Sequence, residues 1–393
     1  MDEGTHPFKY PFTDFLFTIG GLLCFVLDIL LDVLAVGFFY LEGDYWYMGM
    51  LVFLLLSSSL LVQIFSFLWF FYDQDFSTTE SLVKDPCALK IIHVFQMGVF
   101  LRYAGVVKIS ICGFCCKKSL PDPEGEAVFQ SHDLSMLRMF ETFYESAPQL
   151  VLMVTIMIQK GEIDPITLLK AFGSVAAISV SVTMYHRSLR SFLPNKDEQS
   201  WGSSVVYFLW NLLLIGPRVA AVALFASIFP CYIAAHFLCS WMVLFLCAWR
   251  LHTDFMESTG GERLYKATIG LIWYFSWFNV EKGSSKCKST IYHIWIVLDI
   301  GILCGVWVWQ MKKSPPYFHL PIDPYVIFAA KMSLYFSGLG LKVIYYKYCH
   351  PKRTAPGKMQ DEVDLNLRCM PSSPPKPVPR INKRMRNLAD NFY

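Results

Sequence analysis

The chain has 393 residues, of which 54% are hydrophobic and only 17% are charged. Ordinary soluble proteins carry about 25% charged residues, so this composition excludes a soluble globular domain and indicates that lipid is the solvent. The formal net charge is only +3 and the basic residues are scattered, so nucleic acid is not an expected partner.

Ten apolar segments follow one another from residue 12 to residue 346. About 20 apolar residues are enough to cross the bilayer core, so we predict an all-α polytopic membrane protein. The third segment carries three basic residues and the eighth is only 17 residues long, so we expect these two to be re-entrant half-helices alongside about eight transmembrane helices. Both weak segments are third in their half of the chain, which is consistent with an internal repeat of two five-helix halves. The ten segments are residues 12–41, 46–71, 88–112, 134–159, 165–186, 203–228, 231–249, 264–280, 290–311 and 324–346.

Basic residues in the loops predict the orientation. With a cytosolic N-terminus, 22 Lys and Arg residues lie on the cytosolic side and only 3 on the other side. Because Lys and Arg accumulate in cytoplasmic loops, we expect both termini to be cytosolic. The chain then divides into a cytosolic N-terminus over residues 1–11, a transmembrane helical domain over residues 12–347 and a cytosolic regulatory tail over residues 348–393.

Several ionisable side chains lie inside the apolar segments, where each costs about 2.5 to 3.5 kcal/mol. Asp14, Asp28 and Asp32 share one face of the first segment, and the 18 residues between the first and the last correspond to about 27 Å of helical rise. In the fourth segment Glu141 and Glu145 repeat the pattern at a spacing of four. Two predicted helices therefore carry acidic ladders.

Two interpretations of these charges are open. Either they form ion pairs that lock the bundle, or they line a polar track for a charged substrate, which could be an ion, a small solute or a lipid headgroup. A ladder that extends across the bilayer favours the track. The candidate residues are Asp14, Asp28, Asp32, Glu141, Glu145, Arg218 and Asp299.

The sequence contains no G-x-x-x-x-G-K-[ST], H-E-x-x-H or G-x-S-x-G motif, so we expect neither an enzyme nor a bound cofactor. Cys112, Cys115 and Cys116 form the one cysteine cluster. They are interpreted as structural cysteines, with palmitoylation or a metal site as alternatives, because no second ligand pair has zinc spacing.

The tail contains the Pro-rich stretch PSSPPKPVPR and few apolar residues, which predicts disorder. Its end, RINKRMRNLADNFY, predicts a basic amphipathic helix that seeks a membrane surface or a hydrophobic groove. Ile381, Met385, Leu388 and Phe392 form its apolar stripe.

Four stretches resemble the Xk-related family: LSMLRMFETFYESAPQL at 134–150, YFLWNLLLIGPR at 207–218, HTDFM at 252–256 and YFSWFNV at 274–280. With NKRMRNLADNF near the end, the chain is most similar to the members that are activated in apoptosis. The resemblance implies a caspase-activated, ATP-independent phospholipid scramblase of the plasma membrane that exposes phosphatidylserine. It also implies phospholipids as substrates and a single-span immunoglobulin-like glycoprotein, of the basigin or neuroplastin type, as a partner.

The same resemblance assigns the acidic ladders and Arg218 to the family's intramembrane charges. One position departs from the pattern, because Met184 stands where relatives have an acid before Tyr185, His186 and Arg187. An ion or small-solute transporter that uses the same charges is the alternative function, and a scaffold subunit is a third.

One tetrapeptide in the tail resembles the preferred recognition sequence of executioner caspases, which bind the final aspartate through an arginine contact. It reads DEVD and lies in a polar, cytosolic segment. Cleavage there would release the terminal amphipathic helix and remove an inhibitory plug. Its residues are Asp361, Glu362, Val363 and Asp364.

Overall fold

The computed structural model describes residues 10, 12–72, 83, 85–115, 123–161, 165–192, 199–280, 286–313 and 322–350. Throughout these ranges the regular secondary structure is helical, as the composition predicts. The regulatory tail from residue 351, with the DEVD sequence and the terminal amphipathic stripe, lies outside the described residues, as do residues 1–9.

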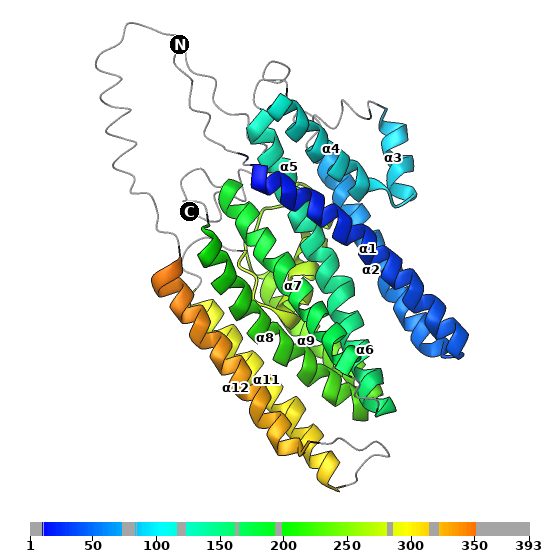
Figure 1. The fold of residues 1–393 in the computed structure, drawn as a ribbon, viewed down its shortest axis with the longest axis vertical. Helices are drawn as coiled ribbons and strands as arrows, with labels where there is room; N and C mark the ends of the chain where they lie inside the picture. Colours follow the sequence, from blue (N-terminus) through cyan, green and yellow to red (C-terminus); the bar gives the residue numbers. More distant parts are fainter. Residues whose placement is uncertain are drawn as a thin grey trace, which may run out of the picture.

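The first half of the chain contains four long helical elements, namely α1, α2, α5–η2–α6 and α7, together with the shorter pair of α3 and α4. Figure 1 shows their arrangement. The elements are α1 (Phe12–Glu42), α2 (Tyr45–Tyr72), α3 (Pro86–Val94), α4 (Gly98–Cys115), α5 (Pro123–Glu141), the π-helical turn η2 (Thr142–Ser146), α6 (Ala147–Lys160) and α7 (Pro165–Phe192).

The second half repeats long helices around one shorter one. The elements are α8 (Trp201–Ile228), α9 (Pro230–Trp249), α10 (Thr259–Phe275), α11 (Lys286–Lys313), α12 (Pro324–Ile344) and the π-helical turn η3 (Tyr345–Cys349). Among the described residues, six helices are long and apolar enough to cross a membrane, namely α1, α2, α8, α9, α11 and α12 with η3.

Both segments that were expected to be re-entrant are short helices. The third is broken into α3 and α4, and between them Gln96 adopts a positive φ of 63° that reverses the chain. The eighth is α10, with 17 residues. Two of the eight expected spans are not among these six helices. They are residues 134–159 and 165–186, which correspond to α5–η2–α6 and α7. Both elements are long but contain more polar side chains than the six.

The fourth element begins earlier than the sequence predicted. Hydropathy placed its start at residue 134, whereas α5 begins at Pro123. The additional turns read PEGEAVFQSHD, whose polarity hides a helix from any hydropathy criterion. Their burial against neighbouring helices, as at Ala127 and Val128, explains why they fold as part of the bundle.

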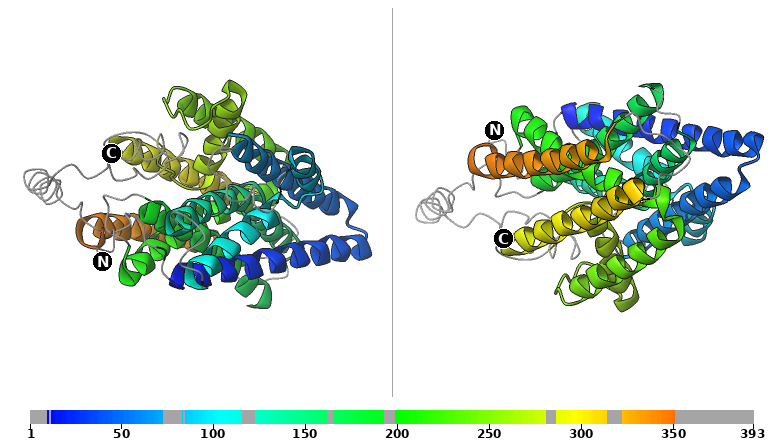
Figure 2. Two further views of the ribbon diagram at one scale, coloured as in Figure 1. Left: turned by 90° about the horizontal axis from the view of Figure 1, so that it is seen from above. Right: turned by 90° about the horizontal axis from the view of Figure 1, so that it is seen from below.

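Helix α8 is the centre of the second half, because it packs against α6, α7, α9, α11 and α12. Its closest neighbour is α12, where a Cβ atom added to Gly338 would lie 3.1 Å from the backbone carbon of Leu213. Small residues let membrane helices approach backbone to backbone, and this contact is an example. Figure 2 shows α1 and α9 at opposite edges of the bundle.

Candidate functional site

Each carboxylate of α1 meets a polar partner from a different part of the chain. Asp14 lies 3.6 Å from Arg187 of α7, and Asp28 lies 3.6 Å from Arg138 of α5. Both distances are measured from an Oδ atom of the aspartate to the Nη2 atom of the arginine. Both acids therefore face neighbouring helices.

The third carboxylate of α1 belongs to an acidic cluster that is mostly buried. Asp32 accepts a hydrogen bond of 2.7 Å from Nε2 of Gln149. Glu145 is buried beside Asp32 and Glu141. Glu141 in turn pairs with Arg138 at 2.5 Å. We call Asp28, Asp32, Glu141 and Glu145 the acidic cluster, of which Asp28 and Glu141 pair with Arg138.

The acidic cluster is built on a local irregularity of the helix. Between α5 and α6 the chain forms the π-helical turn η2, which contains Glu145. Pro148 stands at the start of α6 and has no N–H to donate to Tyr144, so a regular α-helical bond cannot form there. Insertions of this kind are frequent at functional sites, and here the turn brings Glu145 toward α1.

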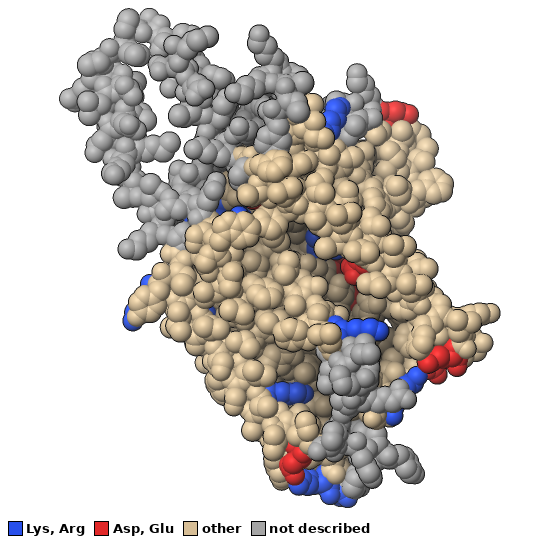
Figure 3. All heavy atoms as spheres, in the orientation of Figure 1, with Lys and Arg blue, Asp and Glu red and all other residues tan. Residues whose placement is uncertain are grey.

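The polar face of α1 is open at its side. Helix α1 packs closely against α2 and α4, and most of its remaining surface is exposed. The side chain of Asp28 is 41% exposed, although it lies near the middle of a helix of 31 residues. In the space-filling view, a hollow beside α1 has acidic and basic atoms at its floor (Figure 3).

Arg218 and Asp299 form a separate network in the second half of the chain. Nη1 of Arg218 lies 2.5 Å from Oδ2 of Asp299, and His236 contacts the other oxygen at 3.0 Å. Nε of Arg218 also donates to the backbone oxygen of Tyr274 at 3.0 Å. Arg218 is only 1% exposed, so this network has the features of a buried brace between α8, α9, α10 and α11. The seven predicted charges thus fall into three groups: Asp14 with Arg187, the acidic cluster, and the brace of Arg218 and Asp299.

Two further charged groups lie outside the seven candidate residues, although Arg102 was expected as a possible counter-charge. Arg102 of α4 pairs with Asp133 of α5 at 3.2 Å and donates to Ser66 of α2. Lys342 of α12 lies 2.7 Å from Nε2 of His293 and is buried. In the sequence, each of these groups is visible only as a charged residue inside an apolar segment. Asp133 lies 31 positions from Arg102, and His293 lies 49 positions from Lys342, so helical periodicity cannot reveal either pair.

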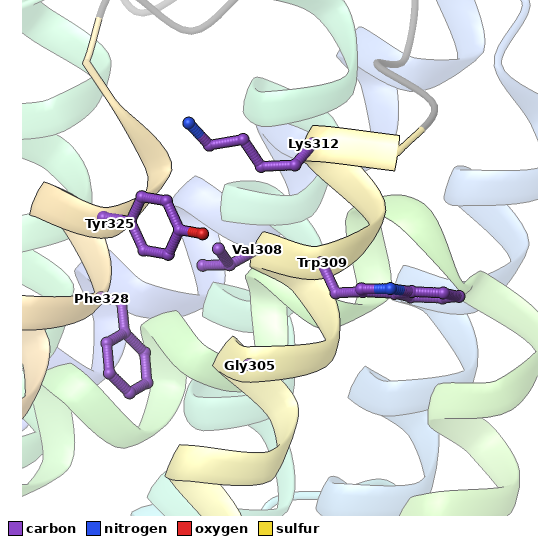
Figure 4. A pocket seen from close by; sticks show the side chains of 6 residues that line it. All are labelled: Gly305, Val308, Trp309, Lys312, Tyr325 and Phe328. Atoms are coloured by element: carbon purple, nitrogen blue, oxygen red, sulfur yellow. The ribbon is translucent and has the colours of Figure 1, made fainter.

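A groove of about 300 Å³ lies between α11 and α12, at the end of the bundle where α12 begins. Figure 4 shows Lys312 and Tyr325 at one end of it and Phe328 further along α12. Lys312 also lies 3.4 Å from Asp323. None of the candidate acids is among the residues that line this groove.

The described part of the cysteine cluster does not form a metal site. Cys112 is a free, half-buried thiol in α4, and Cys116 lies outside the described residues. Across the residues described, no group of three His, Cys, Asp or Glu side chains is arranged to hold a metal ion.

Comparison with known proteins supports one family. A family model described as XK-related protein matches residues 16–351. A protein of Gasterosteus aculeatus named XK-related protein 8 is 40% identical, with 100% of this chain and 99% of the relative covered. Proteins of the same name from Tetraodon nigroviridis and Pan troglodytes are 39% and 35% identical, covering 98% and 97% of this chain and 97% and 94% of their own lengths. These matches span the α1 carboxylates Asp28 and Asp32, the acidic cluster and the buried brace, and the chain belongs to the XK-related family.

Proposed function

We propose that this multi-pass membrane protein is an ATP-independent phospholipid scramblase of the plasma membrane, which exposes phosphatidylserine after caspase cleavage of its tail. The observation that carries the proposal is Asp28. Its carboxylate is partly exposed near the middle of an apolar helix. A charged group facing hydrocarbon at that depth is costly unless water or a polar headgroup reaches it from the side.

The charge balance of the acidic cluster suits a lipid headgroup. Asp28 and Glu141 pair with Arg138, and Asp32 and Glu145 lie beside Glu141, so the cluster has more acidic than basic groups and favours a cationic group. Serine, ethanolamine and choline headgroups each carry such an ammonium group beside their phosphate. The headgroup would pass along the acids of α1 while its acyl chains stay in the bilayer beside the exposed flank. An ion or solute carrier would instead need a path enclosed by protein.

Control of the activity is assigned to the tail. Cleavage after Asp364 would separate the helix with Ile381, Met385, Leu388 and Phe392 from the bundle. A basic amphipathic helix tethered by the tail has a high effective concentration at the cytosolic face, which suits an autoinhibitory plug. We assign an executioner caspase as the protease and a basigin- or neuroplastin-type glycoprotein as the partner subunit, from the family resemblance.

Reconstitution tests the function directly. Purified full-length chain and chain cleaved after Asp364 are placed in phosphatidylcholine vesicles with a trace of fluorescent phosphatidylserine, and bleaching of outer-leaflet dye reports lipid exchange. Only the cleaved chain should make the inner-leaflet dye accessible. Ion flux measured in the same vesicles distinguishes the alternative. A cleaved chain that conducts ions but moves no lipid would identify a transporter and refute the scramblase.

A further inference from the structure

We call the row of Asp14, Asp28 and Asp32 on α1 the charged track, and Arg187 of α7 contacts Asp14 at its predicted cytosolic end. Nη1 of Arg187 donates to the backbone oxygen of Gln199 at 3.0 Å and to Oγ of Ser204 at 3.1 Å. Its guanidinium carbon lies 4.9 Å from the ring centroid of Trp201, and its Nη2 is the partner of Asp14. The segment that leads into α8 therefore positions the cation that joins α7 to α1. The predicted fifth segment ended at residue 186, whereas α7 continues to Phe192 and contains Arg187.

Gln199 connects this arginine to the last described element of the chain. Its side chain is buried, and its Oε1 lies 2.9 Å from Nδ1 of His186. Its Nε2 donates to the hydroxyl of Tyr345 at 3.4 Å. Tyr345 is fully buried as the first residue of η3. One glutamine thus contacts η3 through its side chain and Arg187 through its backbone oxygen.

Aromatic packing makes this connection stiff. The ring of His186 stacks on Tyr207 at a centroid distance of 4.2 Å, and Tyr207 packs against Tyr345 at 5.3 Å. Close-packed side chains transmit displacement, because the interior has little free volume to absorb it. A shift of η3 therefore moves Gln199 and, through it, Arg187. The chain continues from η3 directly toward the residues of the predicted cleavage site.

We propose that Gln199 is a positioning residue that couples η3 to the pair of Arg187 and Asp14. In the intact chain it holds that pair across the cytosolic end of the track, and displacement of Tyr345 after cleavage releases it. This inference rests on the proposed scramblase function. It adds the route by which a change at the tail reaches the charged track.

The test uses two matched pairs of variants in the vesicle assay, each as intact and as cleaved chain. Gln199→Leu and Tyr345→Phe remove the proposed connection. Gln159→Leu and Tyr47→Phe are the controls, because Gln159 also bridges helices through a tyrosine hydroxyl, accepting from Tyr47 at 3.0 Å, but where α6 ends and α2 begins. Gln199→Glu keeps acceptor oxygens for His186 and for the Tyr345 hydroxyl and serves as the conservative variant.

Intact Gln199→Leu should move lipid about fivefold faster than the intact wild type, the population change expected for the loss of one net hydrogen bond. Intact Tyr345→Phe should change in the same direction. Neither should alter the cleaved chain, and Gln199→Glu and both controls should match the wild type. A merely structural role would lower activity in both forms.

Three results would overturn the coupling: an intact Gln199→Leu chain that stays silent, a loss of activity in its cleaved form, or an equal rise in the Gln159 control. A cleaved wild type that moves no lipid is a different result, because it refutes the proposed function and the coupling together. The three results above refute the coupling alone.

Discussion

At the scale of single residues, Asp28 and the brace of Arg218 and Asp299 show two uses of charge inside a bundle. Asp28 is partly exposed and shares Arg138 with Glu141, so its charge is available to a passing group. We expect Asp28→Asn to slow lipid exchange by the cleaved chain about tenfold, equivalent to about 1.4 kcal/mol of barrier. Asp323→Asn, in an exposed position before α12, is the control and should leave the rate unchanged. Normal exchange by Asp28→Asn at normal protein levels would show that the ladder is only structural.

Arg218 should matter for folding instead. Arg218→Leu leaves the buried Asp299 without its cation, and breaking one side of such a pair costs about 3–5 kcal/mol. We expect a lower melting temperature in detergent and poor delivery to the cell surface. The double variant Arg218→Met with Asp299→Leu should recover much of the stability, since apolar replacements of a buried pair are often neutral. A stable, normally delivered Arg218→Leu chain would contradict the assignment as a brace.

At the scale of elements, the contact of α8 with α12 depends on one glycine. A Cβ atom at Gly338 would lie 2.9 Å from Leu214 and 3.1 Å from the backbone of Leu213, whereas one at Gly340 would meet nothing within 4 Å. Gly338→Val should therefore separate the helices and destabilise the bundle by about 1–3 kcal/mol, the usual cost of overpacking. Gly340→Val on the same helix is the control. Thermal unfolding in detergent measures both, and equal melting temperatures would exclude the close approach.

At the scale of the whole molecule, the predicted switch joins the tail to the charged track. Asp364→Ala removes the aspartate that a caspase must bind, so the chain should stay intact and silent in cells driven into apoptosis. A chain that ends at Asp364 should expose phosphatidylserine without any apoptotic signal. Annexin binding at the cell surface reports both results. Exposure by the intact Asp364→Ala chain, or silence of the truncated one, would refute the switch.

The sequence alone determined the class of this protein and much of its plan. Apolar length and composition do not depend on tertiary context, so the all-helical membrane fold and the short eighth segment could be predicted, whereas the break of the third segment into α3 and α4 was not. Helical periodicity likewise placed Asp14, Asp28 and Asp32 on one face, because the residues of one helix keep a fixed angular relation. The start of α5 at Pro123 could not be found in this way, since a polar helix has no apolar signature.

Only the tertiary structure decided which charges meet. Arg187 reaches Asp14, Arg138 reaches Asp28, and Arg218 pairs with Asp299, across sequence separations that no periodicity encodes. It also separated the partly exposed Asp14 and Asp28 from the buried brace, because burial depends on which helices pack together. The exposure of Asp28 at the open flank of α1 is a property of that packing and is invisible in the order of residues.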